Sequence, residues 1–258
     1  MSQTVARAIE IIGFVSRRPR SLGDIADHLG VHKSTALRIL QTLEERGFVR
    51  RVPGDGSFGG GYGVGFQLIA LGQMALDQVE ARSLAHPILR ELSERHGNTV
   101  HLGELVGDQI VYVDKVDGRG SVAMGSRIGL PAKTHTAAVA KVIAAYQDRA
   151  DRAAILSRCD FTRYTPTTIT DRDALEKDLD LTRSRGWAED DGEHEDYINC
   201  VALPVFDARG KVTHGVSITA LRAVAPLARL REQIADFRAA AHRISQNLGW
   251  RGDEYGHR

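Results

Sequence analysis

The residues that could perform covalent chemistry lie in the C-terminal third of this 258-residue chain. Cys200, with His194 or His214 as a base, is the best candidate for a nucleophile. Cys200 nevertheless opens the apolar run 201–205, where a cysteine is more often packing or the wall of a pocket than a nucleophile. The sequence therefore predicts a protein that is not an enzyme and uses no cofactor.

Two other patterns could hold a metal ion or a phosphate group. Glu193, His194, Glu195 and Asp196 could ligate a metal, but four adjacent polar residues usually form a solvated loop. The spacing of structural zinc ligands is also absent. The glycines at 59–61 lack the Gly-Lys-Ser/Thr of a phosphate-binding loop, and no apolar strand precedes them. We expect no metal site and no nucleotide loop.

Short polar donors and cations gather between positions 32 and 51. They are His32, Lys33, Ser34, Thr35, Arg38, Gln41, Thr42, Arg50 and Arg51. Side chains of these types reach base edges and phosphates in the major groove of DNA. Any one of them could equally belong to a solvated helix face, so the prediction rests on the set.

Three helices must position these side chains. Apolar residues at helical spacing predict helices from Thr4 to before Pro19, from Leu22 to Gly30, and from about position 33 to Gly47. A tight turn that contains glycine separates the second helix from the third. This arrangement is typical of a helix-turn-helix motif.

A β-hairpin is expected directly after the third helix. The strand 48–52, the turn 53–57 and a return strand at 59–62 together form a wing, with Arg50 and Arg51 at its base. Residues 1–62 contain nine Lys or Arg and six Asp or Glu, a net charge of +3, which leaves −2 for the rest of the chain. A mildly basic N-terminal segment is typical of a module that contacts phosphates, although a net charge of +3 can equally arise by chance.

The remaining residues predict an α+β domain. Helices are expected at 66–81, 83–96, 136–146, 174–185 and 226–248, and strands at 99–105, 109–116, 121–125, 199–206 and 214–219. No stretch approaches the roughly 18 apolar residues of a membrane span, and no signal peptide is visible. The two cysteines are too few for a disulfide framework, so we expect a cytoplasmic protein.

Two segments together resemble one bacterial family. The first comprises Gly23-Asp24-Ile25-Ala26 and Lys33-Ser34-Thr35-Ala36-Leu37-Arg38-Ile39-Leu40. The second comprises Gly186-Trp187-Ala188-Glu189-Asp190-Asp191-Gly192-Glu193 and Cys200-Val201-Ala202-Leu203-Pro204-Val205-Phe206. The chain thereby resembles the isocitrate-lyase-regulator (IclR) family of transcription factors from about Thr4 to Leu248. The resemblance implies a winged helix-turn-helix domain at 1–65, a linker helix at 66–80, an α+β effector-binding domain with an antiparallel sheet at 81–250, and a tail at 251–258.

The resemblance also implies a cavity that binds small organic or aromatic acids. The family's pocket pattern falls on Ala138, Val139, Asp190, Cys200, Ser217 and Thr219. A helix start at Ala138 would favour an anion, and residues 217 and 219 share one face of a strand. His101 and His135 are expected to be structural, with His135 a further candidate for the cavity wall. The sequence departs from the family at Ala140, at the longer segment 131–135 and at Tyr197, and the first two lie beside the pocket.

The function that these features favour is ligand-responsive transcription regulation. We expect a repressor of a catabolic operon that binds operator DNA as a homodimer or a dimer of dimers and contacts no membrane. Two alternatives stay open. One is a DNA-binding protein that responds to no ligand, and the other is a small-molecule-binding or catalytic module whose winged helix mediates protein contacts.

Overall fold

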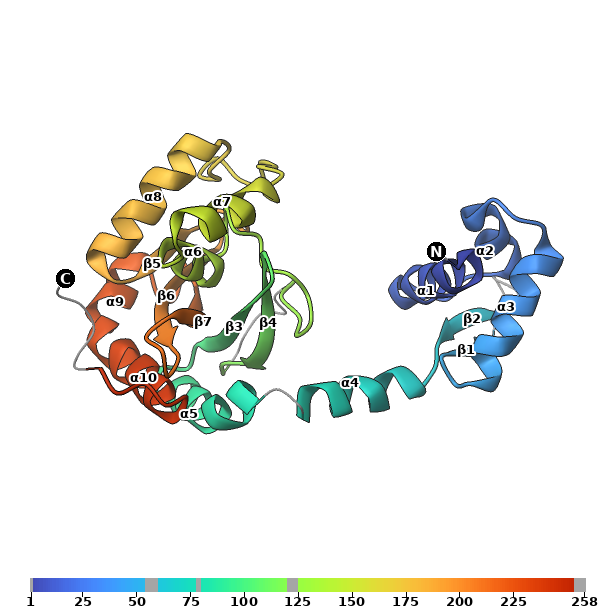
Figure 1. The fold of residues 1–258 in the computed structure, drawn as a ribbon, viewed down its shortest axis with the longest axis horizontal. Helices are drawn as coiled ribbons and strands as arrows, with labels where there is room; N and C mark the ends of the chain where they lie inside the picture. Colours follow the sequence, from blue (N-terminus) through green and yellow to red (C-terminus); the bar gives the residue numbers. More distant parts are fainter. Residues whose placement is uncertain (1, 54–59, 78–79, 120–124, 253–258) are drawn as a thin grey trace. The chain divides into compact units, whose positions relative to one another are not determined.

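The computed structural model describes residues 2–53, 60–77, 80–119 and 125–252, and these form two compact units, Met1–Gln78 and Val79–Arg258 (Figure 1). Each unit has its own hydrophobic core. The expected strand at 121–125 and the expected turn at 53–57 fall largely outside the described residues.

The first unit is a winged helix-turn-helix. Its elements are α1 (Gln3–Arg17), α2 (Leu22–Leu29), α3 (Lys33–Glu45), β1 (Val49–Val52), β2 (Gly61–Val64) and α4 (Gln67–Asp77). Helix α2 begins at a capping box, in which the Ser21 hydroxyl accepts from the Asp24 N–H and the Asp24 carboxylate accepts from the Ser21 N–H. It ends at Gly30, whose φ of +62° is left-handed. The helix-turn-helix and the antiparallel β1–β2 pair confirm the predicted fold of this unit.

The second unit is the expected α+β domain. Its elements are α5 (Glu80–His96), β3 (Thr99–Val106), β4 (Gln109–Val116), α6 (Ala138–Ala145), α7 (Arg149–Ser157), α8 (Arg172–Arg185), β5 (Ala188–Asp191), β6 (Ile198–Phe206), β7 (Val212–Leu221), α9 (Leu227–Glu232) and α10 (Ile234–Asn247). The strands form one fully antiparallel sheet in the order β4-β3-β7-β6-β5. This confirms the predicted antiparallel sheet.

Helices cover both faces of this sheet (Figure 1). Helices α5, α9 and α10 pack on one face through residues such as Leu89, Leu230 and Phe237. Helix α6 lies on the other face, and α8 packs against α6 and the edge strand β5. Strand residues alternate between the two cores, as the two-residue period of a strand requires.

A β-bulge interrupts the pairing of β3 with β4. Leu102 pairs with Asp114 and Gly103 pairs with Tyr112, so Val113 has no partner across the strands. Because of this extra residue, Asp114 turns toward α5, whereas Tyr112 lies on the α6 face. The bulge thus reverses which alternate residues of β4 face α5.

Several predicted elements need correction. The predicted helix 226–248 is two helices, because at Gln233 the backbone leaves the helical conformation (φ −95°, ψ 4°) while Leu230 and Phe237 on either side remain fully buried. Residues 188–191, for which no strand was expected, form edge strand β5, since the antiparallel pairing with β6 overrides their low strand propensity. Helix α7 was not predicted, and α8 is capped by Asp171 and begins at Arg172 rather than at residue 174.

Candidate functional site

Helix α3 presents its polar side at the surface of the first unit. Ala36, Ile39, Leu40 and Leu43 are buried against the other helices. The His32 ring caps the helix, because its Nδ1 accepts from the Ser34 N–H at 3.4 Å. The first turn of α3 is therefore fixed by a side chain from the predicted DNA-binding set.

Eight of the nine residues predicted to contact DNA are exposed, and Thr35 is half-buried. The exposed residues are His32, Lys33, Ser34, Arg38, Gln41, Thr42, Arg50 and Arg51. Seven of the nine belong to α3 or its cap, and two lie on β1. The structure thus brings the set onto α3 and the adjacent hairpin strand.

Some of these side chains already have partners. The Thr42 hydroxyl donates to the Arg38 carbonyl at 3.2 Å. Arg51 forms an ion pair with Glu44 at 3.4 Å, while the Arg50 guanidinium lies 5.5 Å from the centre of the Phe66 ring. An exposed pair of this kind contributes less than about 1 kcal/mol, so phosphate could displace Glu44 from Arg51.

The second unit contains a cavity of about 180 Å³ between the sheet and the start of α6. All six residues of the predicted pocket line it, namely Ala138, Val139, Asp190, Cys200, Ser217 and Thr219. They come from α6, β5, β6 and β7. The cavity thus joins predicted residues that lie up to 81 positions apart (138 to 219).

Strand register explains why the sheet residues meet. Asp190 pairs with Cys200, and Cys200 pairs with Thr219, so these side chains lie in one row across three strands. The Cys200 Sγ is 3.2 Å from the Thr219 Oγ1, which is 3.4 Å from the His101 Nδ1. The His101 Nε2 is 2.9 Å from the Ser126 Oγ. A continuous chain of polar contacts therefore covers the sheet side of the cavity.

The start of α6 supplies free donors on the opposite side. Its cap residue is Ala137, which has no side-chain oxygen. Within the described part of the chain, the N–H groups of Ala138 and Val139 make no hydrogen bond. Since both residues line the cavity, the positive end of the helix dipole faces it, which favours an anion.

Burial sets the protonation of the sheet-side groups. Burial, followed by the charge of Lys115, lowers the pKa of His101 to about 3, so its ring is neutral. Burial raises the pKa of Asp190 to about 6, although the Glu193 N–H and the Lys141 charge oppose the shift. Burial also raises the pKa of the Cys200 thiol far above its ordinary value, and the thiol stays protonated. His101 and Cys200 therefore offer uncharged hydrogen-bonding groups to a ligand, whereas the carboxyl group of Asp190 gains its charge near pH 6.

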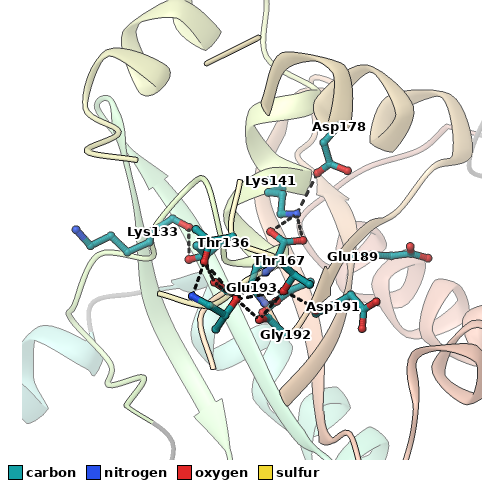
Figure 2. A network of polar contacts seen from close by, with 12 residues as sticks. Lys133, Thr136, Lys141, Thr167, Asp178, Glu189, Asp191, Gly192 and Glu193 are labelled. Atoms are coloured by element: carbon teal, nitrogen blue, oxygen red, sulfur yellow. Dashed lines mark hydrogen bonds and ion pairs between the residues drawn. The ribbon is translucent and has the colours of Figure 1, made fainter. Parts of the chain in front are cut away.

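A buried lysine holds the loop beside the cavity, as Figure 2 shows. Lys141 has no exposed surface, and its Nζ lies 3.0 Å from the Asp178 Oδ2 and 2.8 Å from the Glu193 Oε1. The Glu193 N–H donates to the Asp190 Oδ1 at 2.7 Å. Lys141 thereby fixes Asp190 through the intervening Glu193.

Threonine hydroxyls secure the same loop from its other side. The Thr165 and Thr167 hydroxyls donate to the Gly192 carbonyl at 2.6 and 2.8 Å, and the Thr168 hydroxyl donates to the Glu193 carbonyl at 2.6 Å. His194 and Glu195, the next residues, line the cavity. The part of the cavity wall that this loop forms is therefore held in place by hydrogen bonds that lie outside the cavity.

The geometry does not assemble a nucleophile. The Cys200 thiol is hydrogen-bonded to Thr219 and Asp190, and within the described ranges neither His194 nor His214 is hydrogen-bonded to it. Among the residues that the structure describes, no group of three or more His, Cys, Asp or Glu could hold a metal ion. None of the described helices is long and apolar enough to cross a membrane.

The structure adds wall residues that the sequence did not single out for the pocket. They are His101, Tyr112, Ser126, Lys133, Thr136, His194 and Glu195, with several apolar neighbours. His101 pairs with Ser217 in the sheet, so the two-residue period would have found it once the strand order was known. His135 is not among the wall residues; its Nε2 donates to the Thr162 carbonyl at 3.1 Å.

A winged helix-turn-helix unit followed by an α+β unit with a small cavity defines a two-domain helix-turn-helix regulator. Known families match both units. The family described as "IclR helix-turn-helix domain" matches residues 4–53, and "Bacterial transcriptional regulator IclR C-terminal" matches residues 73–246. The chain belongs to the IclR family of transcriptional regulators.

Individual relatives agree with this assignment. The chain is 34% identical to the HTH-type transcriptional regulator XynR of Escherichia coli, over 96% of this chain and 98% of that protein. It resembles the crystal structure of Thermotoga maritima IclR with a TM-score of 0.80 and 32% identity, over 97% of this chain and all of that one. An IclR homologue from Microbacterium hydrocarbonoxydans, complexed with 4-hydroxybenzoate, shares the fold (TM-score 0.78, 22% identity, 95% and 99% coverage). The family consists of transcriptional regulators and not of enzymes.

Proposed function

We propose that the protein is a repressor of a catabolic operon whose affinity for operator DNA is modulated by a small organic or aromatic carboxylic acid. Helix α3, from its cap His32 to Thr42, would enter the major groove, and Arg50 and Arg51 would contact phosphates. The acid would bind in the cavity at the start of α6.

One observation carries the proposal: the cavity combines the uncapped start of α6 with the hydroxyls of Ser217 and Thr219. Both kinds of donor suit a carboxylate. The cavity of about 180 Å³ is smaller than the roughly 300–1,000 Å³ of pockets for drug-sized ligands, which favours a short or monocyclic acid. The 4-hydroxybenzoate complex of the Microbacterium homologue supports an acid of this size.

The carboxyl group of Asp190 would bind the polar end of such a ligand. With its pKa at about 6, it accepts a hydrogen bond from a ligand hydroxyl when ionised and donates one when protonated. Near neutral pH the ionised form predominates. An acid that also carries a hydroxyl would then satisfy both ends of the cavity.

The active form would be a cytoplasmic homodimer, or a dimer of two dimers, on paired half-sites. Half-sites about one helical turn of DNA apart, or a multiple of it, fit two copies of α3 related by a two-fold axis. We assign residues 1–65 to DNA binding, 66–80 to the linker and 81–250 to effector binding. Acid binding would shift the population of DNA-competent arrangements through the linker.

Fluorescence anisotropy tests the proposal. The labelled probe is the duplex upstream of the protein's own gene, compared with a scrambled duplex over a salt series, before and after addition of small aliphatic and aromatic carboxylates. We expect specific binding that one acid changes by about 5- to 150-fold, the usual range of allosteric coupling. Equal, salt-sensitive binding to both duplexes with no response to any acid would instead identify a ligand-independent DNA binder.

Two sets of variants localise the effects. Arg38→Ala should weaken binding to the upstream duplex. Ser217→Ala and Thr219→Val should abolish the response to the acid and leave DNA binding intact. Thr213→Val is the matched control, because Thr213 lies on β7 but does not line the cavity. An equal loss in Thr213→Val would show that the strand, and not the cavity, is responsible.

A further inference from the structure

Helix α1 forms a groove with the side of α3 that faces it. The groove has a volume of about 410 Å³; Arg7 and Thr4 line it from α1, and Arg38, Thr35 and Thr42 line it from α3. Its floor is apolar, and none of its lining residues is acidic. Two guanidinium groups therefore border one groove beside the proposed recognition helix.

Neither guanidinium is neutralised by a neighbour. Within the described ranges, Arg7 and Arg38 have no ion-pair partner. The acidic residues of the two helices are engaged elsewhere or lie outside the groove: Glu10 contacts His28 at 3.2 Å, and Glu44 contacts Arg51 at 3.4 Å. The groove is thus a positive site whose two charges are available to an anion.

The groove lies on the opposite flank of α3 from the hairpin. The Glu44–Arg51 ion pair places β1 on the Glu44 side of α3. At 3.6 residues per turn, Glu44 lies about 160° around the helix from Thr42, which faces the groove. Arg51 and Arg7 therefore flank α3 on its two sides.

This placement suits the geometry of the major groove. A recognition helix in the groove has a phosphate backbone on each side. In the proposed placement, Arg50 and Arg51 would contact the backbone on the hairpin side. The backbone on the other side would run along the α1 groove, where Arg7 and Arg38 carry the positive charge.

We propose that Arg7 of α1 belongs to the DNA-binding surface and contacts a backbone phosphate on the flank of α3 opposite the hairpin. The inference rests on the proposed placement of α3 on DNA. Nothing in the sequence pattern separated Arg7 from the other basic residues of the first helix. If Arg7 only covers the apolar floor with its methylene groups, it adds nothing to DNA binding.

The salt dependence of DNA binding distinguishes these cases. Arg7→Gln in the full-length chain is compared with Arg17→Gln, an exposed arginine on the same helix that has no ion-pair partner among the described residues. Arg38→Gln reports on the proposed recognition helix, and Arg7→Lys restores the charge. Each variant is titrated with the upstream duplex and with the scrambled duplex between about 50 and 200 mM salt.

We expect Arg7→Gln to weaken binding to both duplexes by the same factor. The slope of log K against log salt should become less steep by about 0.9 for each phosphate that the variant no longer neutralises. Arg17→Gln should keep the wild-type slope, and Arg7→Lys should restore it. Thermal melting confirms that each variant is folded.

Three results overturn the inference. A wild-type slope in Arg7→Gln, together with weaker binding in Arg38→Gln, rejects the role of Arg7 and leaves the proposed function standing. An altered association state in Arg7→Gln with an unchanged slope, measured by analytical ultracentrifugation, assigns the groove to a second copy of the chain. If the wild-type protein binds neither duplex, the proposed function fails and this inference fails with it.

Discussion

Replacing Glu193 by glutamine should make the protein increasingly more stable than the wild type as the pH rises. Glu193 lies beside Lys141 and Asp190 in the loop after β5, and its side chain is almost fully buried. One ammonium group serves three nearby carboxyl groups, because Asp178 also contacts Lys141.

The magnitude follows from the protonation of Glu193. Burial raises its pKa from 4.5 to about 8, although the charge of Lys141 opposes the shift. Between these pH values the folded protein holds a proton that the unfolded chain releases. The contribution of Glu193 to the free energy of unfolding is therefore complete below about pH 4.5 and is lost as the pH rises to about 8.

Glutamine has no such proton. It keeps an oxygen that can accept from Lys141 and resembles protonated glutamate in shape. The stability difference in favour of Glu193→Gln should grow by up to about 1.4 kcal/mol per pH unit between pH 5 and 8. The whole interval corresponds to at most about 5 kcal/mol.

Guanidinium denaturation at several pH values provides the measurement. Trp187 and Trp250, the only tryptophans, both belong to the second unit, so their fluorescence follows its unfolding. Asp196→Asn is the control, because Asp196 lies in the same loop with an exposed side chain. A difference that stays flat with pH, or that falls as the pH rises, would show that Glu193 is ionised and forms a charged pair with Lys141.

Three further predictions concern the elements around the cavity. Lys141→Met should lower the free energy of unfolding by about 3–5 kcal/mol at neutral pH, because the substitution leaves buried carboxyl groups without their cation. Chemical denaturation measures this loss, and a loss below about 1 kcal/mol would contradict the buried pairing. Gly103→Ala should lower the free energy of unfolding by about 1–3 kcal/mol and weaken acid binding, because the added Cβ would lie 2.8 Å from the Val139 Cγ2 at the start of α6. Gly13→Ala, at a position with open space around it, is the control in denaturation and in ligand titrations. Asp114→Asn should accelerate hydrogen exchange in the first turns of α5, since the buried Asp114 carboxylate contacts Arg82 at 3.3 Å and His86 at 2.7 Å; unchanged exchange there would reject a role for this contact in fixing α5.

The winged helix could be predicted from the sequence because its signals are local. The Ser21–Asp24 capping box, the left-handed Gly30 and the apolar spacing of α3 each act within a few residues. Exposure of the polar side of α3 follows from the same spacing. Arg7 was not singled out because its relation to Arg38 depends on how α1 packs against α3, which no local pattern specifies.

The cavity was predictable in part. The resemblance to the IclR family supplied six wall residues, and a strand period placed Ser217 and Thr219 on one face. His101 and Tyr112 required the strand order β4-β3-β7, which places β3 beside a strand more than 100 residues later in the chain. Tyr112 required in addition the bulge at Val113, because a regular strand would place Tyr112 and Asp114 on the same face.

The contrast between Asp190 and Lys141 explains how a cavity that contains acidic residues can suit an anion. The only positive groups at the wall are the free N–H groups of α6 and Lys133, whose Nζ is paired with Asp160 at 2.6 Å; within the described residues no unpaired cation lines the wall. Lys141 lies behind the wall, where it contacts the side chain of Glu193, whose backbone N–H donates to Asp190. In the proposed function, a ligand carboxylate at α6 would therefore meet helix N–H groups and a neutral His101, while the carboxyl group of Asp190 would remain available to a ligand hydroxyl. Selectivity for the acid would then depend on the distance between its carboxylate and its hydroxyl, a distance set by the packing of α6 against Gly103 and Gly215.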